Sequence, residues 1–127
     1  NPSSPELQDL NVGDDLLYHR VSQLAPRCDE ELAGTCGLVV GATYPRELSI
    51  VRDIAPTLPF LIPGIGAQGG NLEQAVLHGP TNGDVGPIIN SSRGIIYASS
   101  GSDFAAAARE AALATRERIN QQRKASQ

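Results

Sequence analysis

Two short loops of this chain carry residue types suited to binding an anion. Residues 64–70 read GIGAQGG after the apolar segment FLIP, and residues 91–94 read SSRG after the next apolar segment, PIIN. Glycines let backbone N–H groups approach an anion, and a guanidinium binds phosphate through paired, charge-assisted hydrogen bonds. We therefore predict a phosphate site made by both loops, with Arg93 as its cation.

The glycine-rich segment also fits other interpretations. Gly64, Gly66 and Gly69 spell the G-x-G-x-x-G pattern of dinucleotide-binding folds, and Asp84 follows about 20 residues later. That acidic residue should stand after the next strand, however, and Asp84 stands before it. A tight turn without a ligand, beside a solvated Arg93, is the other alternative. Two such loops after consecutive strands favour the phosphate site, which is typical of strands seven and eight of a (β/α)₈ barrel.

Few other side chains indicate chemistry. Gln68 stands among glycines, where its amide could reach a ligand or face solvent. Thr43 could line the same site, although helix capping explains it fully. His19 and His78 lack an acidic partner at a telling spacing and are expected on the surface, as are most arginines. No Ser/His/Asp or Cys/His set can be assembled.

Composition limits the class of protein. The chain has 127 residues, enough for one domain, and a net charge of −4. This acidity argues against nucleic-acid binding, and no apolar run approaches the roughly 20 residues of a membrane span. Cys28 and Cys36 lack metal-ligand spacing and are expected as free thiols in the cytoplasm. With one lysine, Lys124, and no methionine, we expect a piece of a larger protein.

The apolar pattern predicts that helices and strands alternate. Helices are expected over residues 14–32, where Pro26 could break the helix, over 45–55, over 72–77 after an Asn71 cap, and over 103–122. Strands are expected at Cys36–Gly41, Phe60–Pro63 and Pro87–Asn90, with residues 95–98 as a short helix or a strand extension. Residues 1–13 are expected as a loop and residues 123–127 as a polar tail.

This alternation implies an α/β fold with parallel strands and right-handed crossovers. Three strands leave two architectures open. One is a small doubly wound sheet, and the other is a segment of a (β/α)₈ barrel whose other strands lie elsewhere. In either case the unpaired strand edges predict self-association unless another segment covers them.

Three sequence blocks, VVGATYPREL, FLIPGIGAQGG and IINSSRGIIYA, resemble the sixth, seventh and eighth strand segments of the orotidine 5′-phosphate decarboxylase family. The closest branch is the bacterial one with a TSNPSS segment after strand five. The resemblance implies that residues 1–122 form the C-terminal half of a TIM barrel, with residues 1–13 as the loop after strand five. It also implies a cytoplasmic homodimer that makes UMP and carbon dioxide from orotidine monophosphate, in de novo pyrimidine biosynthesis, without a cofactor or metal.

The resemblance also assigns roles to residues. The implied ligand-binding residues are Gln68, Ser92 and Arg93 at the phosphate, and Pro63, Gly64 and Asn1 on the ribose and base side. The family's catalytic D-x-K-x-x-D network is absent, so the resemblance places no catalytic residue in this chain. Decarboxylation builds a carbanion that a fixed ammonium must stabilise. The missing N-terminal half of the barrel is therefore the expected partner.

Three other functions stay open on the residues alone. The chain could be a stand-alone phosphate-binding half-barrel without catalysis, part of another phosphate-binding barrel such as an isomerase or aldolase relative, or a packing subunit without a ligand. Fold by itself does not decide among them.

Overall fold

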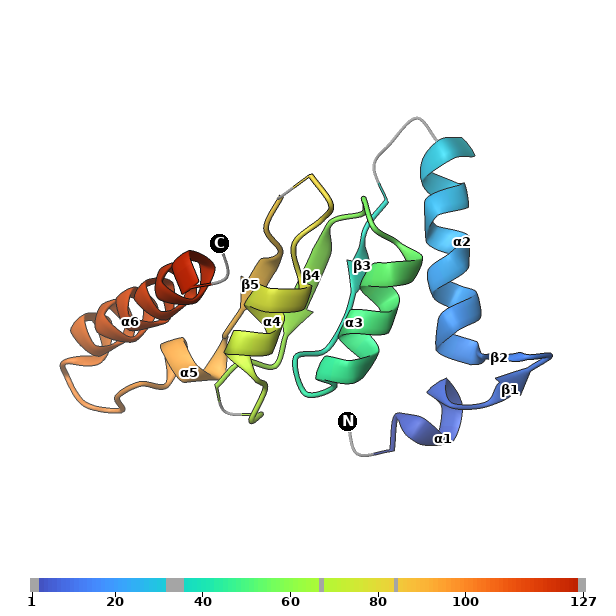
Figure 1. Cartoon of the computed structure of the whole chain (residues 1–127). Coiled ribbons are helices and arrows are strands. Elements are labelled where there is room, and N and C mark those ends of the chain that lie inside the picture. Colours follow the sequence, from blue (N-terminus) through green and yellow to red (C-terminus); the bar gives the residue numbers. More distant parts are fainter. Residues whose placement is uncertain (1–2, 32–35, 67, 84, 126–127) are drawn as a thin grey trace.

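The chain folds into a three-stranded parallel sheet flanked by helices, with a small hairpin near the N-terminus (Figure 1). The computed structural model describes residues 3–31, 36–66, 68–83 and 85–125. The elements in chain order are α1 (Pro5–Gln8), β1 (Asn11–Val12), β2 (Asp15–Leu16), α2 (Leu17–Glu31), β3 (Leu38–Val39), α3 (Pro45–Ile54), β4 (Phe60–Pro63), α4 (Leu72–His78), β5 (Ile88–Asn90), α5 (Arg93–Ile96) and α6 (Phe104–Ala125).

The strands of the main sheet lie in the order β3-β4-β5, which is also their order along the chain. Both pairings are parallel. Their register places Val39, Leu61 and Ile88 in one row across the sheet. Strands that follow one another without a change of direction form a barrel wall, whereas a doubly wound sheet reverses its strand order at a switch point.

One face of the sheet carries the core. Phe60 of β4 is fully buried with Leu48 of α3 and Leu72 of α4. Ala25 of α2 and Ile119 of α6 pack against the same cluster. The four helices α2, α3, α4 and α6 therefore contribute to a single core on one side of the sheet.

The opposite side of the sheet, which we call the open face, is formed by Val39, Leu61 and Ile88. Alternate residues of a strand point to opposite faces, so this row points away from Phe60. Val39 is 69% exposed and Ile88 is 65% exposed. A barrel interior is filled by such layers of apolar side chains from its strands. The chain therefore has the fold of part of a (β/α)₈ barrel, and the doubly wound alternative is wrong.

The N-terminal region is more ordered than the sequence predicts. The expected loop over residues 3–13 contains α1 and β1, and β1 pairs antiparallel with β2. Because β2 occupies Asp15–Leu16, α2 begins at Leu17 and not at residue 14. Pro26 lies inside α2 without ending it, since neighbouring side chains of this helix pack on the core.

Other boundaries differ by a few residues. The first strand of the main sheet is shorter than the predicted Cys36–Gly41. Thr43 is not the N-cap of α3, because Tyr44 holds that position without a side-chain capping bond. The proline after it supplies a backbone already suited to a first helical turn. The last helix continues to Ala125, so part of the expected polar tail is helical.

The central elements match their predicted positions. β4 spans Phe60–Pro63, as the apolar run predicts. Asn71 caps α4, and its side chain accepts a hydrogen bond from the backbone N–H of Gln74 at 2.9 Å. The short helix α5 begins at Arg93, inside the predicted SSRG loop, and ends at Ile96, so only the first half of the segment 95–98, left open between helix and strand, is helical.

Arg52 differs from the expected surface arginine. At the end of α3 it is only 8% exposed, and burial lowers the pKa of its guanidinium. The guanidinium donates hydrogen bonds to the backbone oxygens of Ala55 (2.7 Å), Leu58 (2.8 Å) and Gly79 (2.6 Å). It also lies 3.5 Å from the centroid of the Phe60 ring. This side chain therefore joins the carboxyl ends of α3 and α4 to the segment that enters β4.

We expect Arg52→Met to lower the free energy of unfolding by about 3–5 kcal/mol, because three carbonyl groups lose a buried charged donor. Chemical denaturation measures the loss. Arg109→Met, at an exposed position of α6, is the matched control. Equal losses in the two variants would contradict a special contribution of the buried guanidinium.

Candidate functional site

The candidate site lies where β4 and β5 end. Pro63, the last residue of β4, is paired in register with Asn90, the last residue of β5. The glycine loop (residues 64–70, described apart from residue 67) and the segment that we call the arginine loop (residues 91–94, of which the last two begin α5) therefore leave the sheet at the same level. The carboxyl ends of parallel strands are where ligands bind in barrel enzymes.

The two loops touch each other. The Ser91 hydroxyl donates a hydrogen bond to the backbone oxygen of Ile65 at 3.1 Å. A Cβ atom added to Gly66 would lie 3.2 Å from Ser91 Oγ and 3.7 Å from Gly94 Cα. The lack of side chains at both glycines therefore lets the loops pack directly against one another.

The glycine loop is also held against β3 and α4. The N–H of Gly70 donates to the Gly64 oxygen at 3.0 Å, and the N–H of Asn71 donates to the Ala42 oxygen at 3.1 Å. Gly64 has a φ of 104°, which side-chain-bearing residues rarely adopt. A Cβ atom on Gly70 would lie 2.5 Å from the Gly64 oxygen and 2.7 Å from Ala42 Cβ. The loop therefore needs glycine at both positions to keep this path.

A pocket of about 240 Å³ lies between the loops. Its lining consists of Pro63, Gly64, Ile65, Gln68, Asn90, Ser92 and Arg93. Five of the six ligand-binding residues that the resemblance implies line this pocket. The sixth, Asn1, lies outside the described residues. Gln68 and Arg93 thus share one pocket, a juxtaposition that the phosphate interpretation requires.

The charge of the pocket comes from Arg93. Its side chain is exposed and forms no ion pair with another residue of the described ranges. Gln68 lies along the pocket wall, with its Oε1 atom 3.1 Å from the place that a Cβ would take on Gly64. A guanidinium without a carboxylate partner, next to amide groups, suits an oxyanion such as phosphate.

The sequence argument missed Asn90 and Ile65 as lining residues. A signal for Asn90 was present, because a polar residue closes an otherwise apolar strand at its carboxyl end. No comparable signal marks Ile65, which is 7% exposed and lines the pocket only because the loop turns at this point.

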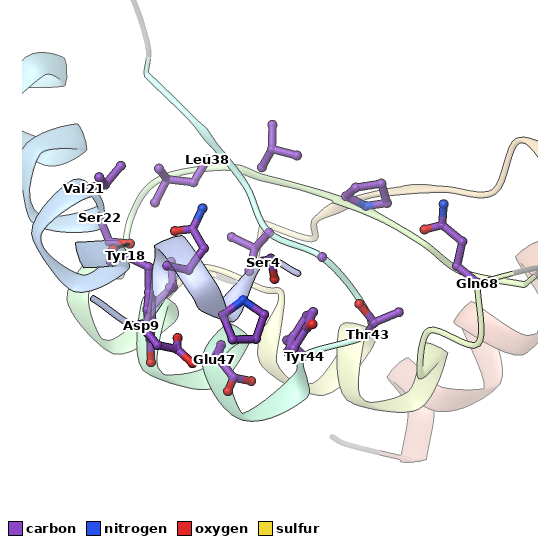
Figure 2. A pocket seen from close by; sticks show the side chains of 17 residues that line it. Ser4, Asp9, Tyr18, Val21, Ser22, Leu38, Thr43, Tyr44, Glu47 and Gln68 are labelled. Atoms are coloured by element: carbon purple, nitrogen blue, oxygen red, sulfur yellow. Dashed lines mark hydrogen bonds between the residues drawn. The ribbon is translucent and has the colours of Figure 1, made fainter. Parts of the chain in front are cut away.

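A larger hollow of about 420 Å³ lies on the other side of Gln68. Pro63 and Gln68 line both cavities, and Thr43 lines the larger one. All four residues from 38 to 41 line it. Because the side chains of alternate strand residues point to opposite faces of a sheet, a hollow that touches four consecutive residues runs along the edge of the strand. The hollow therefore follows the free edge of β3. Figure 2 shows Gln68 at one end and the labelled side chains of α2 at the other.

Neither histidine lines either of these two cavities. His19 does have an acidic neighbour, contrary to expectation, since its Nδ1 atom lies 3.9 Å from Asp15 Oδ1. His78 Nε2 lies 3.1 Å from the side-chain oxygen of Gln74. Across the residues that the structure describes, there is no group of three or more potential metal-ligating side chains. None of the helices in these ranges is long and apolar enough to cross a membrane.

The fold and the pocket define this chain as a segment of a (β/α)₈ barrel with its site at the carboxyl ends of the strands. No family model matches the chain. It is 53% identical over 98 residues to orotidine 5′-phosphate decarboxylase of Azoarcus sp. (strain BH72), and 51% identical over 123 residues to that of Cupriavidus taiwanensis. Its fold matches that of Leishmania donovani OMP decarboxylase with a TM-score of 0.73 and 42% identity.

These matches cover most of this chain but less than half of each relative. They span 77% of this chain and 36% of the Azoarcus protein, and 97% of this chain and 45% of the Cupriavidus protein. The Leishmania structure is matched over 97% of this chain and 45% of its own length. By sequence and by fold, the chain belongs to the orotidine 5′-phosphate decarboxylase family, and it spans only part of the length of these relatives.

We expect Gly70→Ala to lower the free energy of unfolding by about 1–3 kcal/mol, because the added methyl group meets backbone and Ala42 Cβ. Thermal denaturation measures the change. Gly86→Ala is the control, since a Cβ at that position has nothing within 4 Å. A Gly70→Ala variant as stable as this control would contradict the close packing of the glycine loop.

Proposed function

We propose that this chain forms the phosphate-binding part of an orotidine 5′-phosphate decarboxylase, a lyase of pyrimidine biosynthesis. The substrate is orotidine monophosphate, and the products are UMP and carbon dioxide. The observation that carries this proposal is the pocket shared by Gln68 and Arg93, in a chain about half identical to proteins of that name.

In this proposal each lining residue has a physical role. The Arg93 guanidinium pairs with the phosphate oxygens, and the Ser92 segment lies beside them. Gln68, which lines both cavities, extends its amide from the phosphate towards the base. Pro63 and Gly64 line the sugar. A pocket of 240 Å³ is smaller than the roughly 300–1,000 Å³ of typical ligand sites, which fits a phosphate and sugar better than a whole nucleotide.

Bond breaking needs groups beyond this pocket. Loss of carbon dioxide leaves an electron pair on a pyrimidine carbon, and that carbanion must be stabilised and then protonated. Arg93 is the pocket's cation and is assigned to the phosphate. The single lysine, Lys124, stands near the end of α6 and lines neither cavity. Phosphate binding in this chain then contributes by positioning the substrate, whose remote binding energy supports the reaction.

We propose that the remaining strands of the barrel are the partner of this chain. The open face leaves Val39 and Ile88 without cover. The hollow beside β3 follows an unpaired strand edge, where a further parallel strand would find hydrogen-bonding groups. We also expect the assembled protein to be a cytoplasmic homodimer, as the resemblance implies.

A stand-alone phosphate-binding half-barrel is the second candidate function. It is favoured by one observation, namely that the residues lining the smaller pocket, Gln68 and Arg93 among them, all lie between positions 63 and 93 of one continuous segment. Such a protein would bind phosphosugars or nucleotides as a stable monomer, without another polypeptide.

Enzymatic turnover distinguishes the two candidates. The test protein is a complete barrel, which we define as this chain fused to the part of the Cupriavidus taiwanensis relative that lies outside the alignment. We expect the complete barrel to decarboxylate orotidine monophosphate and the isolated chain to show no turnover. Release of carbon dioxide measures both. Turnover by the isolated chain would contradict the assignment of catalysis to other segments. A folded complete barrel that binds UMP without turnover would favour the binding module.

We expect Arg93→Ala to weaken UMP binding by the complete barrel about 10- to 150-fold, because a charge-assisted hydrogen bond contributes about 1.5–3 kcal/mol. Isothermal titration calorimetry measures the dissociation constant. Arg109→Ala removes an exposed arginine outside the pocket and serves as the control. Unchanged UMP affinity in Arg93→Ala would reject its role at the phosphate.

A further inference from the structure

Asn90 is a lining residue to which neither the sequence patterns nor the resemblance assigned a role. It is the last residue of β5, and its side chain is exposed at the pocket that contains Arg93. It shares the orientation of Ile88, two residues earlier, on the open face of the sheet. Asn90 therefore lies on a strand, whereas Gln68 lies in the glycine loop and Arg93 is the first residue of α5.

One hydrogen bond orients the Asn90 side chain. The Ser92 hydroxyl donates to Asn90 Oδ1 at 3.1 Å. The carbonyl end of the amide is therefore directed to Ser92, the residue just before Arg93. The amide nitrogen, at the other end, has no hydrogen bond to another residue within the described ranges. Two N–H donors are thus available at a pocket whose charge is positive.

We infer that the side-chain amide of Asn90 donates a hydrogen bond to the substrate phosphate, beside the Arg93 guanidinium. The inference rests on the proposed function, since it names a further ligand of the same nucleotide. An amide nitrogen is a donor that carries no charge of its own, so it binds an oxyanion without needing a counter-charge. The Ser92 bond fixes the side chain before the ligand arrives, which lowers the entropy lost on binding.

Asn90→Asp tests this inference in the complete barrel. Aspartate has the shape of asparagine and still accepts the bond from Ser92, but it replaces the two donors by a carboxylate oxygen facing the phosphate. We expect UMP affinity to fall about tenfold or more and uridine affinity, which involves no phosphate, to stay unchanged. Calorimetry with both ligands measures the difference, and Asn120→Asp, at an exposed position of α6, is the matched control.

The UMP and uridine affinities of the variants decide whether Asn90 contacts the phosphate. Unchanged UMP affinity in Asn90→Asp would overturn the inference, because the side chain would then only hold Ser92. Equal losses for UMP and uridine would also overturn it, since the contact would be with the sugar or base. If Asn90→Asp does not fold, Asn90→Ala is measured instead, and a loss confined to UMP is again the expected result. A wild-type complete barrel that fails to bind UMP would reject the proposed function itself.

Discussion

The candidate site depends on the register between β4 and β5. Because Pro63 is paired with Asn90, the glycine loop and the arginine loop leave the sheet at one level and can touch. The Ser91 hydroxyl then bonds the backbone of Ile65, and a small pocket remains between the loops. A shift of one residue in this pairing would turn the side chain of Asn90 to the helix-covered face and would separate the two loops. The geometry of this pocket is therefore a consequence of strand pairing rather than of either loop alone.

The helices cover one face of the sheet and leave the other face open. The covered face contains the core, and the open face leads to the pocket. Phe60 and its neighbours stabilise the chain on the covered face. Val39 and Ile88, on the open face, are apolar but exposed in this chain. In a barrel with all of its strands, side chains at such positions form the packed layers of the interior. The pocket stands at the end of this open face. A partner that completes the barrel would thus bury the apolar row and extend the site in the same step.

Two arginines show how the environment determines the role of one residue type. Arg52 is buried, stacks on Phe60 and donates to three backbone oxygens, so its charge serves the packing of α3 against α4. Arg93 is exposed at the pocket and has no carboxylate partner in the described part of the chain, so its charge is available to a ligand. The linear sequence assigned Arg93 correctly to the neighbourhood of Gln68. No local pattern indicated that Arg52 is buried, because one of its hydrogen-bond acceptors, the backbone oxygen of Gly79, lies 27 positions further along the chain.

Local patterns were sufficient for the features that depend on neighbouring residues. The apolar run Phe60–Pro63, the Asn71 cap and the glycine-rich turn after β4 are set by propensity, capping and glycine, which act over a few positions. The resemblance supplied the barrel and the family, since motif order and spacing persist in related chains. The residue pattern without the resemblance left a barrel wall and a doubly wound sheet open, and the tertiary structure confirmed the barrel wall, because strand order is a property of contacts distant in sequence. It also brought Asn90 to the pocket, since strand register determines what lies beside the last residue of a strand.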